Sequence, residues 1–109
     1  MAGRVIRGGV HLYRFARPDK ERPVLVLTRD SAVGYLSTVT VAPITPAIRG
    51  VPSEVILDEH DGMKAPCAVN LHHTVTISQQ RLGRRVSQLG PKRMNEVCRA
   101  LRFALGCDG

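Results

Sequence analysis

The sequence predicts a mainly β (α+β) protein, in which a small, strongly bent antiparallel sheet or partial barrel is covered by a C-terminal α-helix. Two patterns predict this fold class. Short runs of β-branched and apolar residues, separated by proline, glycine and aspartate turn signals, follow one another from residue 10 to residue 89. A helical period of 3.6 residues is found only in the last part of the chain. Because 109 residues is a length typical of one domain, we expect residues 1–109 to form a single domain.

The first two strands are expected near the N-terminus. Val10–Phe15 reads VHLYRF and alternates apolar with polar side chains, as a half-buried strand does. After a short charged loop, Pro23–Thr28 reads PVLVLT. This continuous apolar run predicts a strand buried on both faces, with the proline tolerated at its first position. A short helical or turn segment, RDSAVGYL, comes next.

A third strand is expected at Ser37–Thr45, which reads STVTVAPIT. Pro43 inside it predicts an edge strand or a bulge near the end of the strand. An Asp-Gly turn signal in EHDGM interrupts the pattern that follows. The remaining strands are predicted at Ser53–Asp58, in PCAVNLHH, in TVTIS and at Arg84–Leu89.

The last element is predicted to be an amphipathic helix in GPKRMNEVCRALRFALG. Pro91 suits its first turn, and Gly106 suits the position just after its end. One stripe at helical spacing predicts the surface that packs on the sheet. The stripe consists of Met94, Val97, Cys98, Leu101 and Leu105.

The charge of the chain points to a phosphate-bearing partner. Sixteen basic residues, most of them arginine, stand against nine acidic ones, for a net charge of +7 and an isoelectric point near 10.2. A guanidinium pairs with phosphate in two places, where lysine offers a point charge. With two tyrosines, two phenylalanines and no tryptophan, a base-stacking platform of the RRM or OB kind is not expected.

Three cysteines without a CxxC spacing indicate neither a disulfide framework nor a zinc site, so no metal and no cofactor are expected. No apolar run approaches the roughly 18 residues needed to cross a bilayer, and the N-terminus lacks the apolar core of a secretory signal. We therefore expect a cytoplasmic protein that does not associate with a membrane.

Residues with useful chemistry gather where the predicted strands begin and end. In an antiparallel meander the end of one strand lies beside the start of the next, and consecutive strands are neighbours in roughly two thirds of cases. The residue before a proline is held in an extended conformation, which stiffens Arg22 and Thr45. With sequential strand order, one rim of the sheet would collect Phe15, Arg22, Thr45, Ser53 with Glu54, and His72.

The sequence also resembles a known family. The segments RPVLVLTRD, VTVAPITPAIRGVPSEVIL, CAVNL and RLGRRVSQLGPKRMNEV resemble, in their order and spacing, the MazF/PemK toxins of bacterial type II toxin–antitoxin pairs. The resemblance covers the chain from about Val5 to Leu105. The series of motifs is fairly specific, because the Arg-Pro strand, the APIT strand and the LGR and LGP segments all occur in sequence.

The resemblance implies an SH3-like, CcdB/Kid-like barrel that forms a homodimer. It implies sequence-specific cleavage of single-stranded RNA without a metal, a reaction that can proceed by attack of a 2′-hydroxyl on its own phosphate. It also implies an antitoxin partner whose flexible tail covers the RNA groove of the dimer. The family's catalytic arginine carries over to Arg22, where it would stabilise the charge on the phosphorane, and its catalytic threonine to Thr45, which would orient the phosphate.

Two departures from the family leave the general base and acid open. Where some members have a glutamate about five residues before the arginine, this chain has Arg17, and where some have a catalytic aspartate it has His72. His72 is one candidate, because an imidazole exchanges protons readily at neutral pH. Glu21 is the other.

Basic residues that flank the expected rim are candidates for contacts with the RNA backbone, namely Arg14, Arg17, Lys20 and Arg49. Two other functions stay open. The chain could be a toxin that binds a DNA topoisomerase through the end of its C-terminal helix, as relatives of this barrel do, or a catalytically silent RNA-binding barrel. Incubation with a long RNA in EDTA separates these two functions from the endoribonuclease. Cleavage indicates the endoribonuclease, binding alone the silent RNA-binding barrel, and neither cleavage nor binding the topoisomerase-binding toxin.

Overall fold

The computed structural model describes residues 5–15 and 21–107. Within these residues it has seven strands, two α-helices and two short 3-10 helices. The strands are β1 (Gly9–Arg14), β2 (Glu21–Val26), β3 (Thr38–Thr45), β4 (Glu54–Leu57), β5 (Cys67–Asn70), β6 (Val75–Ser78) and β7 (Arg85–Gln88). The helices are α1 (Asp30–Val33), α2 (Pro91–Leu105), η1 (Glu59–Asp61) and η2 (Gln79–Arg81).

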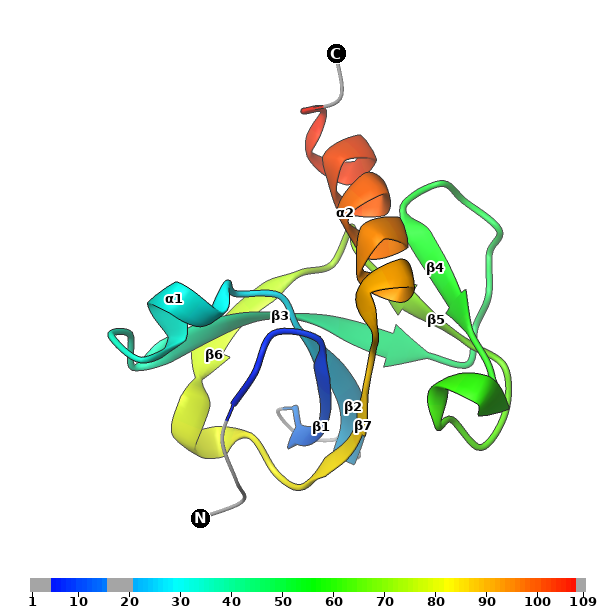
Figure 1. Ribbon diagram of the computed structural model, residues 1–109. Helices are drawn as coiled ribbons and strands as arrows, with labels where there is room; N and C mark the ends of the chain where they lie inside the picture. The colour runs from blue at the N-terminus through cyan, green and yellow to red at the C-terminus, as the bar shows by residue number, and fades with distance from the viewer. Residues whose placement is uncertain (1–4, 16–20, 108–109) are drawn as a thin grey trace.

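The strands form one curled antiparallel sheet in the order β4-β5-β3-β2-β1-β7, and β6 also pairs with β3. Strand β3 crosses the molecule and α2 stands over the end that carries β4 and β5 (Figure 1). Along one edge of β3 lies β2; along the other, β6 pairs with its first half and β5 with its end. The predicted mainly β fold with a C-terminal helix is confirmed.

Of the two alternatives predicted for Pro43, an edge strand or a bulge, the edge strand is wrong, because β3 has neighbours on both sides. Pro43 pairs with Val24 of β2. On the other side it lies between Val41, the last partner of β6, and Ile44, the first partner of β5. A proline donates no N–H, and it is tolerated where a ladder is interrupted in this way.

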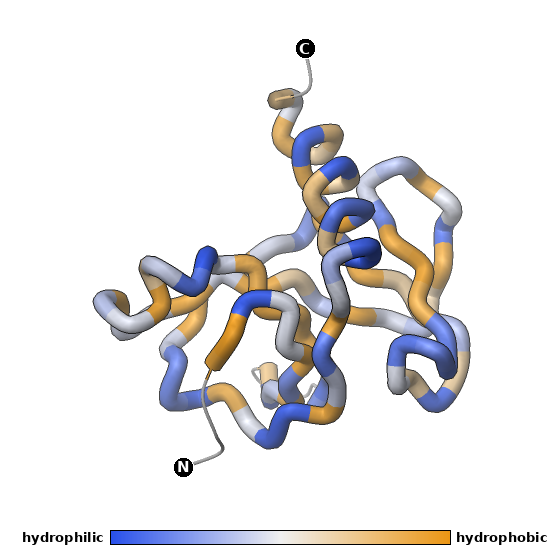
Figure 2. Tube along the Cα trace, in the orientation of Figure 1, coloured by the Kyte–Doolittle hydropathy of each residue, from blue (hydrophilic) through white to orange (hydrophobic). Residues whose placement is uncertain are grey.

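Two apolar clusters form on the two faces of the sheet. Residues of β2 alternate between them: Leu25 belongs to the cluster under α2, whereas Val24 and Val26 belong to the opposite one. All three have no exposed surface, which confirms the strand predicted to be buried on both faces. In Figure 2 the apolar segments follow the strands at the centre of the molecule. The second cluster comprises Tyr13, Val24, Val26, Val39, Val41 and Leu82, with Val5, Phe15 and Ile77 packed against it.

Helix α2 begins with Pro91 and ends at Gly106, whose φ of 71° lies in the left-handed region that favours glycine. Met94, Val97 and Ala100 are its buried residues. Leu105 was predicted to lie on the docking stripe, but its side chain is 64% exposed. The C-terminal end of α2 extends past the sheet, so the last turn has no sheet surface to contact (Figure 1).

The start of α2 is tied to η1 by an ion pair. The Arg93 guanidinium donates from Nε to Asp61 Oδ1 over 3.0 Å and from Nη2 to Asp61 Oδ2 over 3.1 Å. Burial raises the pKa of Asp61, but hydrogen bonds from Arg93 and from the backbone N–H of Asp58, together with the charge of Arg93, hold that pKa below its ordinary value of 3.8. In the described part of the chain, no helix is long and apolar enough to cross a bilayer.

Candidate active site

Arg22 and Thr45 lie at one end of the β2–β3 pair, on the same face of the sheet. The two strands pair Val24 with Pro43 and Leu25 with Ala42. The paired residues end there: Arg22 and Thr45 each lie two residues beyond the pair Val24 and Pro43, so by alternation they project to the same face as that pair. Directly opposed residues of an antiparallel pair project to the same face of a sheet. A guanidinium and a hydroxyl are therefore neighbours on one face, and the guanidinium is exposed.

The Thr45 hydroxyl is held in place by the turn that follows it. Its Oγ1 accepts a hydrogen bond from the backbone N–H of Ala47 over 3.2 Å. Because that bond uses a lone pair of the oxygen, the hydroxyl proton is left to donate to a substrate. Pro23 and Pro46 restrict the backbones of Arg22 and Thr45 to extended conformations, so the backbone that carries both groups is set before any ligand arrives.

The prediction that Ser53, Glu54 and His72 share this rim is wrong, because β5 rather than β4 pairs with β3. Thr45 lies opposite Ala68 of β5. Glu54 lies opposite Asn70, two residues further along β5, which amounts to about 6.6 Å. His72 follows Asn70 and lies further still from the level of Arg22 and Thr45. The predicted rim assumed sequential strand order, which the insertion of β5 between β3 and β4 breaks.

His72 and His73 occupy the bend between β5 and β6. The Ser53 hydroxyl and His72 Nδ1 are 2.5 Å apart, and the backbone N–H of His72 donates to Asn70 Oδ1 over 3.2 Å. Asn70 Nδ2 lies 3.0 Å from His73 Nδ1, and the two rings meet edge to face with centroids 4.6 Å apart. Within the described residues Nε2 of His72 has no hydrogen-bond partner, so it is the ring nitrogen available for proton exchange.

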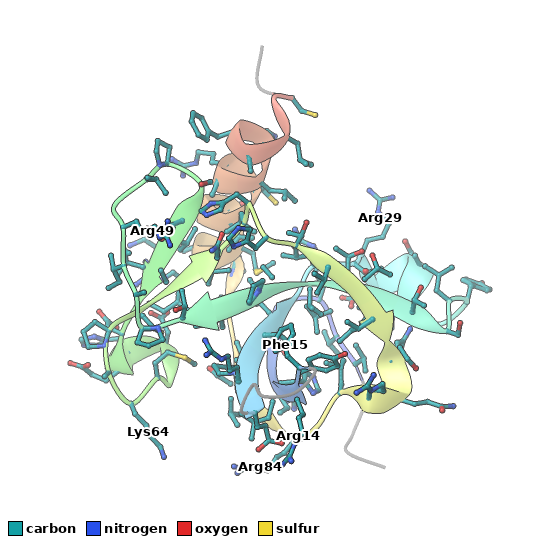
Figure 3. The ribbon with its side chains drawn as sticks, turned by 180° about the vertical axis from the view of Figure 1, so that it is seen from behind. Arg14, Phe15, Arg29, Arg49, Lys64 and Arg84 are labelled. Atoms are coloured by element: carbon teal, nitrogen blue, oxygen red, sulfur yellow. The ribbon has the colours of Figure 1, made fainter. Side chains whose placement is uncertain are left out.

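Glu21 and Arg14 lie on the other face of the sheet. They are opposed to each other in the β1–β2 register, one step from the opposed pair Tyr13 and Arg22. Successive residues of a strand project to opposite faces, so the Glu21 carboxylate points away from the Arg22 guanidinium. In Figure 3 Arg14 is seen at the lower rim near Arg84, whereas Phe15 projects over the sheet.

Arg49 lies in the exposed segment between β3 and β4 (Figure 3). Its backbone N–H and that of Gly50 donate to the Glu54 carboxylate over 3.1 Å and 2.9 Å. This contact fixes the loop that carries the Arg49 side chain. The two remaining basic candidates, Arg17 and Lys20, lie outside the described residues.

Sequence reasoning missed a cationic group on the face of Arg22. The guanidinium carbon of Arg81, in η2, lies 5.5 Å from the ring centroid of Tyr13. The Tyr13 ring meets the Phe15 ring edge to face, with centroids 4.8 Å apart. The alternation in VHLYRF could have placed the two aromatic rings on one face, but no local signal links residue 81 to residue 13.

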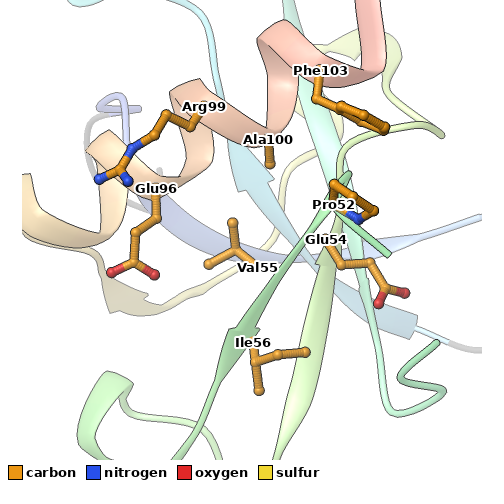
Figure 4. A pocket seen from close by; sticks show the side chains of 8 residues that line it. All are labelled: Pro52, Glu54, Val55, Ile56, Glu96, Arg99, Ala100 and Phe103. Carbon is orange, nitrogen blue, oxygen red and sulfur yellow. The ribbon is translucent and has the colours of Figure 1, made fainter. Parts of the chain in front are cut away.

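The structure also has an open pocket of about 430 Å³ between β4 and α2. Phe103 and Pro52 lie at one end of it and Glu96 and Arg99 at the other, and Val55 is directed at the helix (Figure 4). Its wall carries charges of both signs, the carboxylates of Glu54 and Glu96 and the guanidinium of Arg99. The pocket is not on the face of Arg22 and Thr45. Among residues 5–15 and 21–107, no three His, Cys, Asp or Glu side chains are grouped closely enough to hold a metal ion.

Comparison with known proteins identifies the family. A family model described as "PemK-like, MazF-like toxin of type II toxin-antitoxin system" matches residues 7–105. The chain belongs to this PemK/MazF family. Its relatives include "Probable endoribonuclease MazF2" of Mycobacterium tuberculosis, 36% identical over 97 residues that span 88% of this chain and 95% of the relative. "Endoribonuclease MazF3" of the same organism is 39% identical over 93 residues, 85% of this chain and 90% of the relative.

Solved structures of the PemK/MazF family have the same fold. The structure titled "Mycobacterium tuberculosis toxin MazF-mt6" is 36% identical, with a TM-score of 0.84 over 93% of this chain and 99% of that one. A second, "Endoribonuclease in complex with its cognate antitoxin from Mycobacterial species", has a TM-score of 0.87 over 97% of this chain and 99% of that one. At 23% identity it shows the likeness of fold alone.

Proposed function

We propose that this PemK/MazF toxin is an endoribonuclease that cuts single-stranded RNA at a specific short sequence, without a metal. The observation that supports the proposal most strongly is that Arg22 and Thr45 lie on one face of the sheet, at the same end of the β2–β3 pair. Curated relatives that are 36% and 39% identical over most of the chain are named as endoribonucleases, which supports the same activity. The net charge of +7 favours a polyanionic substrate.

The proposed reaction is attack of the RNA 2′-hydroxyl on the adjacent phosphate. A bond forms between the 2′-oxygen and phosphorus, and the bond from phosphorus to the 5′-oxygen breaks. A base takes the proton of the 2′-hydroxyl, and an acid gives a proton to the departing 5′-oxygen. The products are a 2′,3′-cyclic phosphate and a 5′-hydroxyl, and no water or metal is consumed.

Arg22 is proposed to stabilise the negative charge that builds up on the phosphorane. Its fork of N–H donors can bind two phosphate oxygens at once, which a lysine cannot do. Thr45 is proposed to donate its hydroxyl proton to a phosphate oxygen and so to orient the phosphorus for attack. The spacing of neighbouring strands, about 4.8 Å, is suited to a phosphate held between the two side chains.

For proton transfer the proposal keeps His72 and leaves out Glu21. The carboxylate of Glu21 projects to the opposite face from Arg22, as the β1–β2 register requires. The imidazole of His72 lies further along the sheet than Arg22 and Thr45, whereas direct proton transfer requires hydrogen-bond contact with an oxygen of the scissile linkage, so the pH profile of His72→Gln decides whether it takes part. Arg49 is proposed to contact the RNA backbone from the exposed loop that follows Thr45.

We further propose that the chain acts in the cytoplasm, as a homodimer that a cognate antitoxin inhibits by covering the RNA groove. The matching family model describes toxins of type II toxin-antitoxin systems, which supports an antitoxin partner. Sedimentation equilibrium of the purified protein should give twice the chain mass of 11.9 kDa. A mass equal to one chain at micromolar concentration would contradict the dimer.

The activity is tested by incubating the purified protein with a defined single-stranded RNA in excess EDTA and mapping the new ends. The proposal expects cleavage at a fixed sequence with 5′-hydroxyl ends, and no cleavage at a site where the attacking nucleotide carries a single 2′-deoxy substitution. Binding without cleavage would indicate a silent RNA-binding barrel. Neither binding nor cleavage would favour a protein target such as a topoisomerase.

A further inference from the structure

We propose that Tyr13, Phe15 and Arg81 form a stacking site for one unpaired nucleobase, next to the phosphate that is cut. This inference rests on the proposed endoribonuclease function and adds a base-recognition site to it. The site would bind the base of a nucleotide that flanks the scissile phosphate. It lies on the β1 side of Arg22, and Thr45 lies on the β3 side.

The three side chains share a face with Arg22. Tyr13 is directly opposite Arg22 in the β1–β2 register, and opposed residues project to one face. Phe15 follows two residues later and packs against the apolar cluster that contains Tyr13 and Val24. The neighbouring strand lies about 4.8 Å away, so a base next to a phosphate held by Arg22 is within reach of the cluster.

The cluster presents a stacking surface rather than a closed core. Tyr13 is 7% exposed and forms its floor. The Arg81 guanidinium lies over the Tyr13 ring with its carbon 5.5 Å from the centroid, and Arg81 is exposed to solvent. Phe15 is partly exposed and meets Tyr13 edge to face at 4.8 Å. Unpaired RNA bases stack on aromatic rings and on guanidinium planes of this kind.

The surface is held in place before any RNA binds. One ring nitrogen of the buried His11, Nδ1, lies 2.9 Å from the carbonyl oxygen of Gly83, and the N–H of Gly83 donates to the Leu12 carbonyl over 2.7 Å. Leu82 is buried in the same apolar cluster as Tyr13. These contacts tie the residues that follow η2 to β1 and hold Arg81 over Tyr13. A preorganised surface loses little side-chain entropy on binding.

A low aromatic content argued against a platform that stacks many bases in succession, and the structure does not contradict that expectation. A single base needs only one ring and one guanidinium plane. The stacking site would therefore contribute to the choice of sequence at one position. Because every base has a flat face, the site would accept every base at that position and would favour the bases that stack more strongly.

The test uses RNA substrates in which one nucleotide at a time, around the cleavage site, lacks its base. For the wild-type protein, removing the stacked base should lower kcat/KM by roughly 10- to 100-fold at one position. Arg81→Ala and Phe15→Ala should each lower kcat/KM on intact RNA. Each variant should also lose much of its sensitivity to the missing base at that position, because truncating the side chain and removing the base eliminate the same stacking contact. Arg84→Ala, which changes an exposed arginine three residues further along, should keep the full sensitivity.

Binding is measured in parallel by fluorescence anisotropy, with RNA that carries a 2′-deoxy sugar at the cleavage site and is therefore not cut. If the wild-type protein binds but does not cut normal RNA, the proposed nuclease function fails, and the abasic series still tests the stacking site through Kd. The inference is overturned if no abasic position weakens cleavage or binding, if both variants behave like Arg84→Ala, or if the wild-type protein does not bind RNA.

Discussion

Arg22 of β2 and Thr45 of β3 lie on the same face of the sheet, each two residues beyond the pair Val24 and Pro43 and each followed by a proline. Arg22 is at the start of one strand and Thr45 at the end of the next, so the two residues lie at the same end of the β2–β3 pair. Since β-strands are rigid and neighbouring strands have a fixed spacing, the distance between the two groups does not depend on a loop. This placement makes the roles of both residues directly testable.

Replacing the guanidinium should remove the main charge stabilisation of the reaction. Arg22→Ala should lower kcat by about 10²- to 10³-fold, the usual effect of losing one electrostatic donor, and Arg22→Lys should recover little because it cannot bind two oxygens at once. Single-turnover cleavage of a fluorescent RNA measures this. Arg29→Ala, another exposed arginine, is the matched control. Equal rates for Arg22→Ala and Arg29→Ala would rule out the assignment.

The contribution of the Thr45 hydroxyl can be tested separately from that of the side chain's shape, because valine has the same shape without the hydroxyl. Thr45→Val should reduce cleavage by about 10²-fold, and it should also cost about 1 kcal/mol of unfolding free energy because the N–H of Ala47 loses its acceptor. Thr45→Ser keeps the hydroxyl and should retain most of the cleavage rate and most of the stability. Rates are compared with urea unfolding of the same samples. A Thr45→Val protein that is destabilised yet cuts at the wild-type rate would show that Thr45 stabilises the turn and has no role in cleavage.

The role of His72 should appear in the dependence of kcat on pH. If its imidazole transfers a proton, His72→Gln should flatten the acid limb of the profile and lower the rate at neutral pH by about 10²-fold or more. His73→Gln, the adjacent exposed imidazole, is the control and should keep the limb. An unchanged profile for His72→Gln would remove His72 from the mechanism, and its contact with Ser53 would then be structural.

Contacts with the RNA backbone should show in the dependence of binding on salt. Arg49→Gln should weaken binding to all single-stranded sequences to a similar extent and reduce the slope of log K against log salt by about 0.7, the value for one phosphate contact. Lys64→Gln, which removes an exposed cation from the segment between η1 and β5, should leave the slope unchanged. Equal slopes for wild type and Arg49→Gln would exclude Arg49 from the interface.

The ion pair between Asp61 and Arg93 should make stability depend on acid pH. The pKa of Asp61 is lower in the folded than in the unfolded protein, so its contribution is complete above the ordinary value of 3.8 and is lost as pH falls below it. Asp61→Asn should cost roughly 1–3 kcal/mol at pH 7, and less at pH 3. Urea unfolding at both pH values measures this. Glu59→Gln, an exposed carboxylate in the same turn, should show no such difference.

Local patterns predicted the elements well. The helix from Pro91 follows from its 3.6-residue period and its end from Gly106, both of which depend on residues close in sequence. The strands were placed to within two residues at most ends, because alternation and turn residues act locally. The exposure of Leu105 was missed, since a periodic pattern does not show where the sheet beneath a helix ends.

The sequence by itself determined the seven strands and the terminal helix, the positive charge, and the stiff Arg-Pro and Thr-Pro steps that single out Arg22 and Thr45. Only the tertiary structure decided that β5 pairs with β3, which separates His72 from those two residues, and that Arg81 lies over Tyr13. The physical reason is that strand order and side-chain contacts between distant segments are set by how the whole sheet curls to bury both of its faces. No short segment of the sequence contains the information that sets this strand order and these contacts.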